Sequence, residues 1–230
     1  MIKVTFWGDK VYGTGLTDKV ILLMSRSKMP LASTSSSSLD QWFITDSKID
    51  ALYPEPIQLL AGRHWTPLNI TQMVVEFLAT HQGVKVLDIG SGVGKFCLAG
   101  AYYKPYASFF GVEQRKRLVV HAETAKGALG LHNVHFIHSN ITQLDFKQYD
   151  HFYFFNSFYE NLMIIDKIDD AITHSPHLYS YYHRELYKKL EQMPAGTRIA
   201  TFHCLEDKMP AGYLQIDAKV GTLLKFWMKI

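Results

Sequence analysis

The sequence predicts an α/β fold built on a parallel sheet, and three observations support this class. A short apolar stretch at residues 84–89 runs directly into a glycine-rich segment and then into an apolar helix that begins near Phe96. Further apolar stretches of strand length alternate with helical patterns toward the C-terminus. The chain has 230 residues and a hydrophobic content of 47%, which is enough to bury one sizeable core.

The glycine-rich segment after this first strand is typical of a loop that binds a ligand through its backbone. Gly90, Gly92 and Gly94 lack the Cβ atoms that keep a ligand away, and the start of the next helix offers unpaired N–H groups. A dinucleotide fingerprint needs the spacing G-x-G-x-x-G, whereas this loop has G-x-G-x-G followed by Lys95. The spacing therefore disfavours a nicotinamide dehydrogenase. We keep this class of enzyme only as the least favoured alternative.

Two carboxylates flank this loop. Asp88 lies two residues before the first glycine, where it can receive an ammonium group. Glu113 ends the next expected strand, residues 107–112, where a carboxylate can accept both hydroxyls of a ribose. The pattern D-x-G-x-G-x-G resembles motif I of the class I S-adenosylmethionine (SAM) dependent methyltransferases. The resemblance implies SAM as the cofactor, with Asp88 facing its amino group, and the loop residues expected to bind it are Gly90, Ser91, Gly92 and Gly94.

The resemblance also implies the Rossmann-like, seven-stranded sheet of that class, with strand order 3-2-1-4-5-7-6 and strand 7 antiparallel. The other elements expected from the sequence fit this scheme. They are a helix at 114–127, a strand at 133–137, a strand at 149–155, a helix at 179–192, a strand at 197–203 and two final strands at 213–218 and 222–229.

The N-terminal part, residues 1–60, is expected to be a partly flexible, partly helical extension, and residues 61–230 to be the SAM-dependent methyltransferase domain. The serine-rich segment 33–38 has no periodicity and predicts a loop or linker. A short helix is expected near residues 47–52, followed by an extended segment that contains Pro54.

Thr66 and Pro67 introduce a helix whose apolar residues recur at helical spacing, with Thr66 as its expected N-cap. In many methyltransferases a helix at this place covers the cofactor, so Thr66 is a candidate contact; the alternative is simply a capped helix. The later basic run Arg115-Lys116-Arg117 is expected to be a solvated helix face, with contact to an acidic substrate as the alternative.

Polar residues follow the third and fourth expected strands, at the edge where an open parallel sheet binds its ligands. Asn140 stands where the resembled class usually carries an Asp that contacts the adenine amino group, and its carbonyl can accept the same hydrogen bond. Residues 156–161, Asn-Ser-Phe-Tyr-Glu-Asn, resemble motif IV of methyltransferases acting on nitrogen. Asn156 and Tyr159 match that motif, and the two residues between them depart from it.

The same segment is similar to the Asn-x-Phe of the non-SET histone-lysine methyltransferases, which share the Gly-Ser-Gly-Val-Gly loop. A group of uncharacterised bacterial SAM-dependent methyltransferases resembles this chain over about residues 46–230. These resemblances imply an enzyme that methylates a nitrogen, with a protein lysine side chain preferred as the acceptor. A small molecule or a nucleobase as acceptor, and a SAM-binding protein without turnover, remain the alternatives.

Methyl transfer from a sulfonium is an in-line displacement, so the protein must align a nitrogen that keeps its lone pair. Asn156 is expected to orient this nitrogen through its side-chain carbonyl, and Tyr159, or Phe158 beside it, to stack on a planar target or enclose a methylated ammonium. Glu160 is a possible base, although its expected role is that of a solvent-facing acid at a helix start. His64 and His203 are candidates only because they lie beside the expected crevice.

The composition bounds partners and location. The net charge of +3 permits an acidic partner, but no RNA-binding module or long basic tail supports nucleic acid. Cys97 and Cys204, the two cysteines, do not have metal-ligand spacing, so we expect no metal and a reduced, cytoplasmic protein. The longest apolar run near the N-terminus, residues 20–24, is too short for a membrane span.

Overall fold

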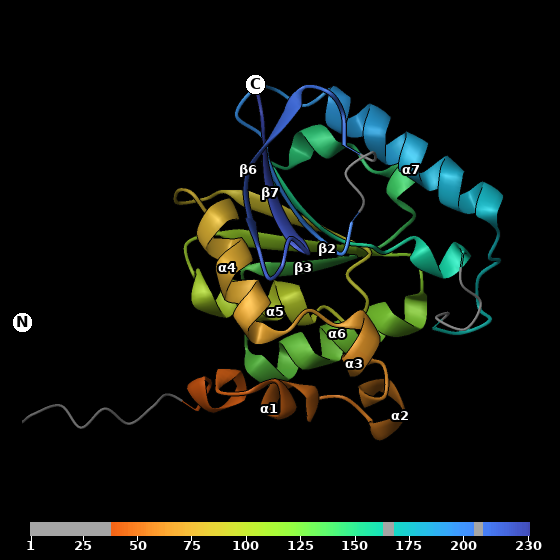
Figure 1. Ribbon diagram of the computed structural model, residues 1–230. Coiled ribbons are helices and arrows are strands. Elements are labelled where there is room, and N and C mark those ends of the chain that lie inside the picture. The colour runs from red at the N-terminus through yellow and green to blue at the C-terminus, as the bar shows by residue number, and fades with distance from the viewer. Residues whose placement is uncertain (1–37, 163–167, 205–208) are drawn as a thin grey trace, which may run out of the picture. The chain divides into compact units, whose positions relative to one another are not determined.

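The computed structural model describes residues 38–162, 168–204 and 209–230 (Figure 1). These residues form a seven-stranded sheet in the order β3-β2-β1-β4-β5-β7-β6, which confirms the predicted order. β7 pairs antiparallel with both β5 and β6, whereas the other neighbours are parallel. The strands are β1 Lys85–Ile89, β2 Ser108–Glu113, β3 Val134–His138, β4 His151–Phe155, β5 Arg198–Phe202, β6 Tyr213–Lys219 and β7 Leu224–Lys229.

Helices cover both faces of this sheet (Figure 1). The helices α4, α5 and α6 pack with one face and form the larger part of the core, because their apolar sides recur at helical spacing. The opposite face packs against α7 and the short helices η2 and η3. The helix bounds are α4 Leu68–Leu78, α5 Lys95–Tyr103, α6 Lys116–Leu129, α7 Pro176–Glu191, η2 Ile141–Gln143, η3 Phe146–Gln148 and η4 Tyr159–Asn161.

The described part of the N-terminal segment consists of short helices rather than one helix and an extended stretch. These are η1 Asp40–Phe43, α1 Asp46–Asp50, α2 Glu55–Gln58 and α3 Ala61–His64. The extended segment expected after residues 47–52 was therefore wrong, since Pro54 and Pro56 lie at the start of α2, where proline fits a first helical turn.

Apolar residues of this segment are buried in the same core as the sheet and α4, among them Phe43, Ile49 and Ile57. The division of the chain at residue 60 remains a prediction. Residues 1–37, which include nearly all of the serine-rich segment, lie outside the described residues.

The start of α4 differs from the expected N-cap. Pro67 is the N-cap residue, and the Thr66 hydroxyl is instead 2.9 Å from the Tyr153 hydroxyl. The Leu68 backbone N–H donates to Asp46 Oδ1 of α1 at 3.0 Å. A partner 22 residues away thus caps this helix, which local sequence spacing cannot indicate.

Candidate functional site

Three adjoining cavities lie at the carboxyl ends of β1, β2 and β4, and Gly90 lines all three. The large cavity has a volume of about 750 Å³, within the roughly 300–1,000 Å³ common for ligand sites. Two smaller cavities of about 30 Å³ each adjoin it, and we call them the Asp88 cavity and the Asn140 cavity after one lining residue of each. All candidate residues named from the sequence except Gly94 line at least one of the three. Their roles toward a cofactor remain predictions.

The glycine loop is shaped by its neighbours. Gly90 has a φ of 77°, and a Cβ there would collide with Ser157 of the loop after β4. Gly92 has a φ of 55°, but a Cβ there would meet nothing within 4 Å, so its backbone is open toward the large cavity. Gly94 lies at the N-cap of α5, against Phe136, and lines none of the three cavities. The loop therefore offers a backbone surface that a ligand can approach closely.

Glu113 lies at the end of β2 and lines both the large cavity and the Asn140 cavity. Its carboxylate accepts hydrogen bonds from the backbone N–H of Arg115 at 2.8 Å and of Gly92 at 3.2 Å. Burial raises the pKa of Glu113, and these N–H groups and the Arg115 charge oppose the rise. A carboxylate has about four acceptor positions, so the capacity to accept two ribose hydroxyls remains.

Asp88 is only 4% exposed and lines the Asp88 cavity with Ser91 and Thr66. Burial raises the pKa of Asp88 to about 8, although the Cys97 thiol, which donates to Oδ2 at 3.7 Å, opposes the rise. A cation that entered this cavity would favour the ionised carboxylate. The site therefore fits the ammonium group that the sequence pattern implies.

Asn140 is fixed by three hydrogen bonds. Its Oδ1 accepts from the Thr142 N–H at 3.0 Å, and its Nδ2 donates to the Tyr182 hydroxyl at 3.0 Å and to Gln114 Oε1 at 3.3 Å. The amide oxygen has a second lone pair with which it can accept a hydrogen bond from an amino group. The Asn140 cavity can thus hold a polar edge of a planar ligand.

The loop after β4 lies directly beside the glycine loop. The Ser157 hydroxyl donates to the Ile89 carbonyl at 2.6 Å, which explains why a small hydroxyl residue stands at this departure from motif IV. Asn156 has a φ of 40°, and Tyr159 is 39% exposed; both line the large cavity. Phe158 is largely buried against Phe154 but also lines the Asn140 cavity, and its suggested stacking role remains a prediction.

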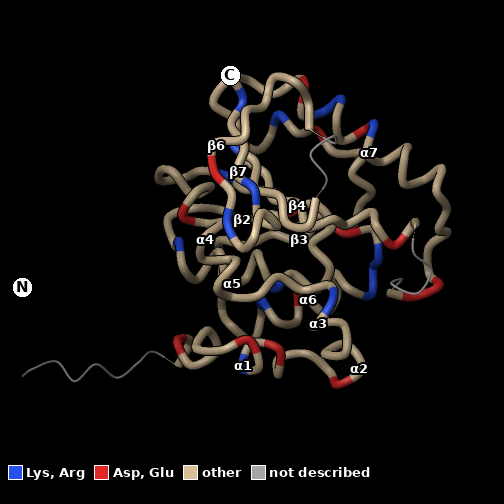
Figure 2. The backbone as a smooth tube through the Cα atoms, viewed as in Figure 1, with Lys and Arg blue, Asp and Glu red and all other residues tan. Residues whose placement is uncertain are grey.

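A buried charge cluster contradicts two expectations. Arg115 and Glu160 were expected to face solvent, yet they are only 4% and 8% exposed. The Arg115 guanidinium donates to both Glu160 oxygens, at 3.0 and 2.6 Å, and to Asp169 at 2.9 Å. Its Nη1 also lies 3.8 Å from Glu113. Figure 2 shows basic residues at the start of α6 beside acidic residues of the connection between β4 and α7. Because these partners are more than 40 residues apart, no local pattern could reveal the cluster.

We expect Arg115→Met to lower the free energy of unfolding by about 3–5 kcal/mol, because it leaves buried carboxylates without their counter-charge. Chemical denaturation measures this loss. Arg117→Met is the matched control, since Arg117 is 57% exposed and also pairs with Asp169; a change of about 0–1 kcal/mol is expected there. Equal losses in the two variants would contradict the structural importance of the cluster.

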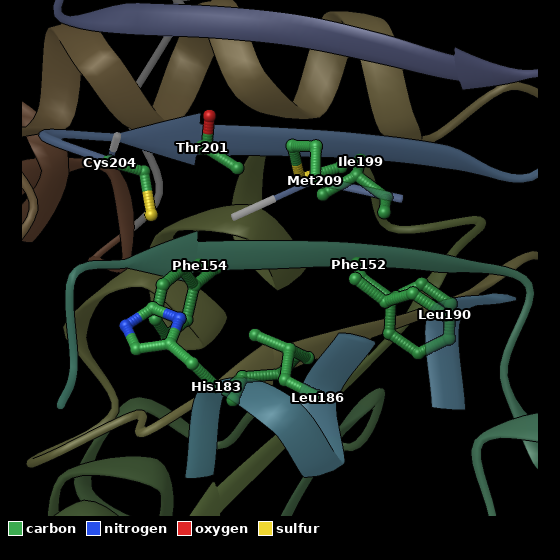
Figure 3. A pocket seen from close by; sticks show the side chains of 10 residues that line it. Phe152, Phe154, His183, Leu186, Leu190, Ile199, Thr201, Cys204 and Met209 are labelled. Carbon is green, nitrogen blue, oxygen red and sulfur yellow. The ribbon is translucent and has the colours of Figure 1, made fainter. Parts of the chain in front are cut away.

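A further cavity lies between α7 and strands β4 and β5. Figure 3 shows His183, Leu186 and Leu190 of α7 facing Phe152 and Phe154 of β4. Its volume is about 10 Å³, and its lining is mostly apolar. That is close to the minimum needed for a single water molecule, so this cavity is not a cofactor site.

The histidines near the sheet differ in their surroundings. His151 is buried; its Nδ1 accepts from the Arg198 N–H at 3.1 Å, and burial lowers its pKa, so it has a structural role. His64 and His203 both line the large cavity. Among the described residues, no three His, Cys, Asp or Glu side chains are grouped so as to hold a metal. None of the helices in the described segments is both long and apolar enough to cross a membrane.

Residues 80–213, more than half of the chain, match the family described as "Methyltransferase domain". The chain belongs to this family. TrmN from Thermus thermophilus has a similar fold, with a TM-score of 0.52 over 76% of this chain and 52% of TrmN, at 16% identity. An RNA methyltransferase from Salinibacter ruber, solved with S-adenosylhomocysteine, has a TM-score of 0.51 over 72% of this chain and 93% of its own, also at 16% identity. At such identities the likeness shows the fold alone.

The curated relatives are tRNA (guanine-N(7)-)-methyltransferases. The one from Trichormus variabilis is 36% identical over 81 residues, which are 35% of this chain and 37% of the relative. The one from Synechococcus sp. (strain JA-3-3Ab) is 51% identical over 55 residues, 24% of this chain and 23% of the relative. The matches thus span about a quarter to a third of these relatives. The family and fold confirm a class I SAM-dependent methyltransferase domain, with SAM as its cofactor. These relatives do not support the more specific likeness to histone-lysine methyltransferases.

Proposed function

We propose that this protein transfers the methyl group of SAM to a ring nitrogen of a purine base in RNA. The observation that carries the proposal is the position of Asn156 and the exposed Tyr159, which line the large cavity next to Gly90 of the glycine loop. An amide and an aromatic ring beside the loop suit a planar nitrogen acceptor, since the ring can stack and the amide can orient.

The residues that line these cavities suit the methionine, ribose and adenine parts of SAM, in the order in which the parts are joined in the cofactor. The Asp88 cavity suits the amino group of the methionine part, Glu113 suits the ribose hydroxyls, and the Asn140 cavity suits the adenine edge. Gly90 lines all three cavities, which supports a cofactor that runs across this glycine. Bound SAM supplies an electrophilic methyl group on a sulfonium centre.

The protein's own part in the transfer is alignment. The acceptor lone pair forms the new N–C bond while the C–S bond breaks and its electron pair passes to sulfur. Asn156 orients the acceptor with a neutral carbonyl, which stabilises developing positive charge without trapping it. A purine ring nitrogen with a free lone pair has no proton to lose, so this reaction needs no general base.

The charges that line the large cavity favour a nucleic-acid acceptor over a lysine ammonium. Its lining carboxylates, Glu113 and Glu160, are engaged by backbone N–H groups and by Arg115. Arg63 of α3, an exposed basic residue, lines the same cavity. A cationic lysine would find little net negative charge there, whereas a phosphate backbone would be attracted to Arg63. The names of the curated relatives agree with this choice.

The proposal is tested by incubating the protein with methyl-labelled SAM and either bulk tRNA or an RNase-treated protein extract. We expect label in the tRNA that RNase removes, and a methylated purine on nucleoside analysis. Label confined to the protein pool would contradict the proposal and favour a lysine acceptor. Tight SAM binding without label in either pool would favour a SAM-binding protein without turnover.

A further inference from the structure

Two neighbouring strands each lead into a non-glycine residue with a left-handed backbone. Asn156 follows β4 with a φ of 40°, and His203 follows β5 with a φ of 54°. The register pairs Phe155 with Phe202, so the two residues that come next adjoin at the same edge of the sheet. Both line the large cavity.

A left-handed backbone is uncommon for residues other than glycine, although Asn and His adopt it more often than most side chains do. The other described non-glycine residues with positive φ, Val220 and Thr222, lie in the tight connection between β6 and β7, where such angles are common. Asn156 and His203 instead follow parallel strands. Strain of this kind is found mainly where a site requires a particular side chain.

The imidazole of His203 is held by aromatic rings from both strands. Its centroid lies 4.4 Å from that of Phe202 and 5.7 Å from that of Phe155. The His203 backbone N–H donates to the Leu223 carbonyl at 2.9 Å, which anchors the main chain. These contacts hold an exposed imidazole at the wall of the large cavity.

We propose that His203 binds the acceptor base together with Asn156, an inference that rests on the proposed function. A neutral imidazole presents one donor and one acceptor nitrogen, and an amide presents both kinds of group. Side by side, the two can bind the edge of a purine, which presents ring nitrogens next to an exocyclic carbonyl or amino group. His203 thus selects the acceptor and has no part in binding SAM.

The test compares His203→Gly, His203→Asn and Thr222→Gly. Glycine suits the left-handed backbone, so His203→Gly removes the imidazole and leaves the fold intact. We expect its Kd for SAM to stay within about twofold of wild type and its kcat/KM for tRNA to fall about tenfold or more. His203→Asn, which tolerates the same backbone and retains a polar group, should recover part of the loss. Thr222→Gly makes the same change at a remote positive φ and should behave as wild type.

The outcomes separate the inference from the proposed function. An active wild type whose His203→Gly variant retains kcat/KM for tRNA within about twofold overturns the inference alone. A parallel loss of SAM affinity in His203→Gly also overturns it, since it would place the imidazole in the cofactor site. A wild type that methylates no RNA overturns the proposed function and this inference with it.

Discussion

Asp88→Asn is expected to weaken SAM binding at least about a hundredfold, because it removes the one negative charge that the Asp88 cavity offers to the cofactor's ammonium group. Titration calorimetry of wild type and variant measures the effect. Asp217→Asn is the control, since Asp217 is exposed on β6. Binding by Asp88→Asn within about threefold of wild type would show that the cofactor's amino group is held elsewhere.

The same carboxyl predicts a pH dependence. Burial raises the pKa of Asp88 from the ordinary 3.8 to about 8, so between these values the folded state holds a proton that the unfolded state releases. The contribution of Asp88 to stability therefore falls as pH rises from about 4 through about 8. Asp88→Asn should raise the Tm of the free protein more at pH 9 than at pH 6. SAM binding near pH 7 should release up to about one proton, seen as a buffer-dependent binding enthalpy.

Asn156→Gly is expected to lower kcat about a hundredfold or more while the Kd for SAM changes little. Glycine keeps the positive φ of 40° without strain, so the variant isolates the loss of the amide. Single-turnover kinetics with labelled SAM and tRNA measure the chemical step. Val220→Gly, a change at another positive φ, should leave both quantities unchanged. An Asn156→Gly variant with wild-type kcat would remove Asn156 from the acceptor site.

The parts of the fold that local signals encode were predictable. The strand before the glycine loop, the acid at the end of β2 and the antiparallel pair at the C-terminus each carry their own pattern over a few residues. Because parallel strands end at one edge, these local signals also predicted that Asp88, Glu113 and Asn156 would come close together. The structure brings them to adjoining cavities around Gly90.

The parts that depend on distant partners were not predictable in this way. Arg115 resembles any basic residue at a helix start, and only the approach of Glu160 and Asp169 makes it a buried ion-pair centre. Asp46 caps α4 from another helix, which displaces Thr66 from its expected role. The positive φ of His203 could not be predicted, because no glycine stands at that position. The imidazole is found beside Asn156 only because β4 pairs with β5.

The most direct test of this account is a crystal structure of the protein with S-adenosylhomocysteine. We predict the adenine amino group near Asn140, the ribose hydroxyls on Glu113, the amino group on Asp88, and the sulfur facing Asn156 and the large cavity. A ligand bound outside these cavities, or bound in the reverse direction with adenine in the Asp88 cavity, would contradict the assignment of the site.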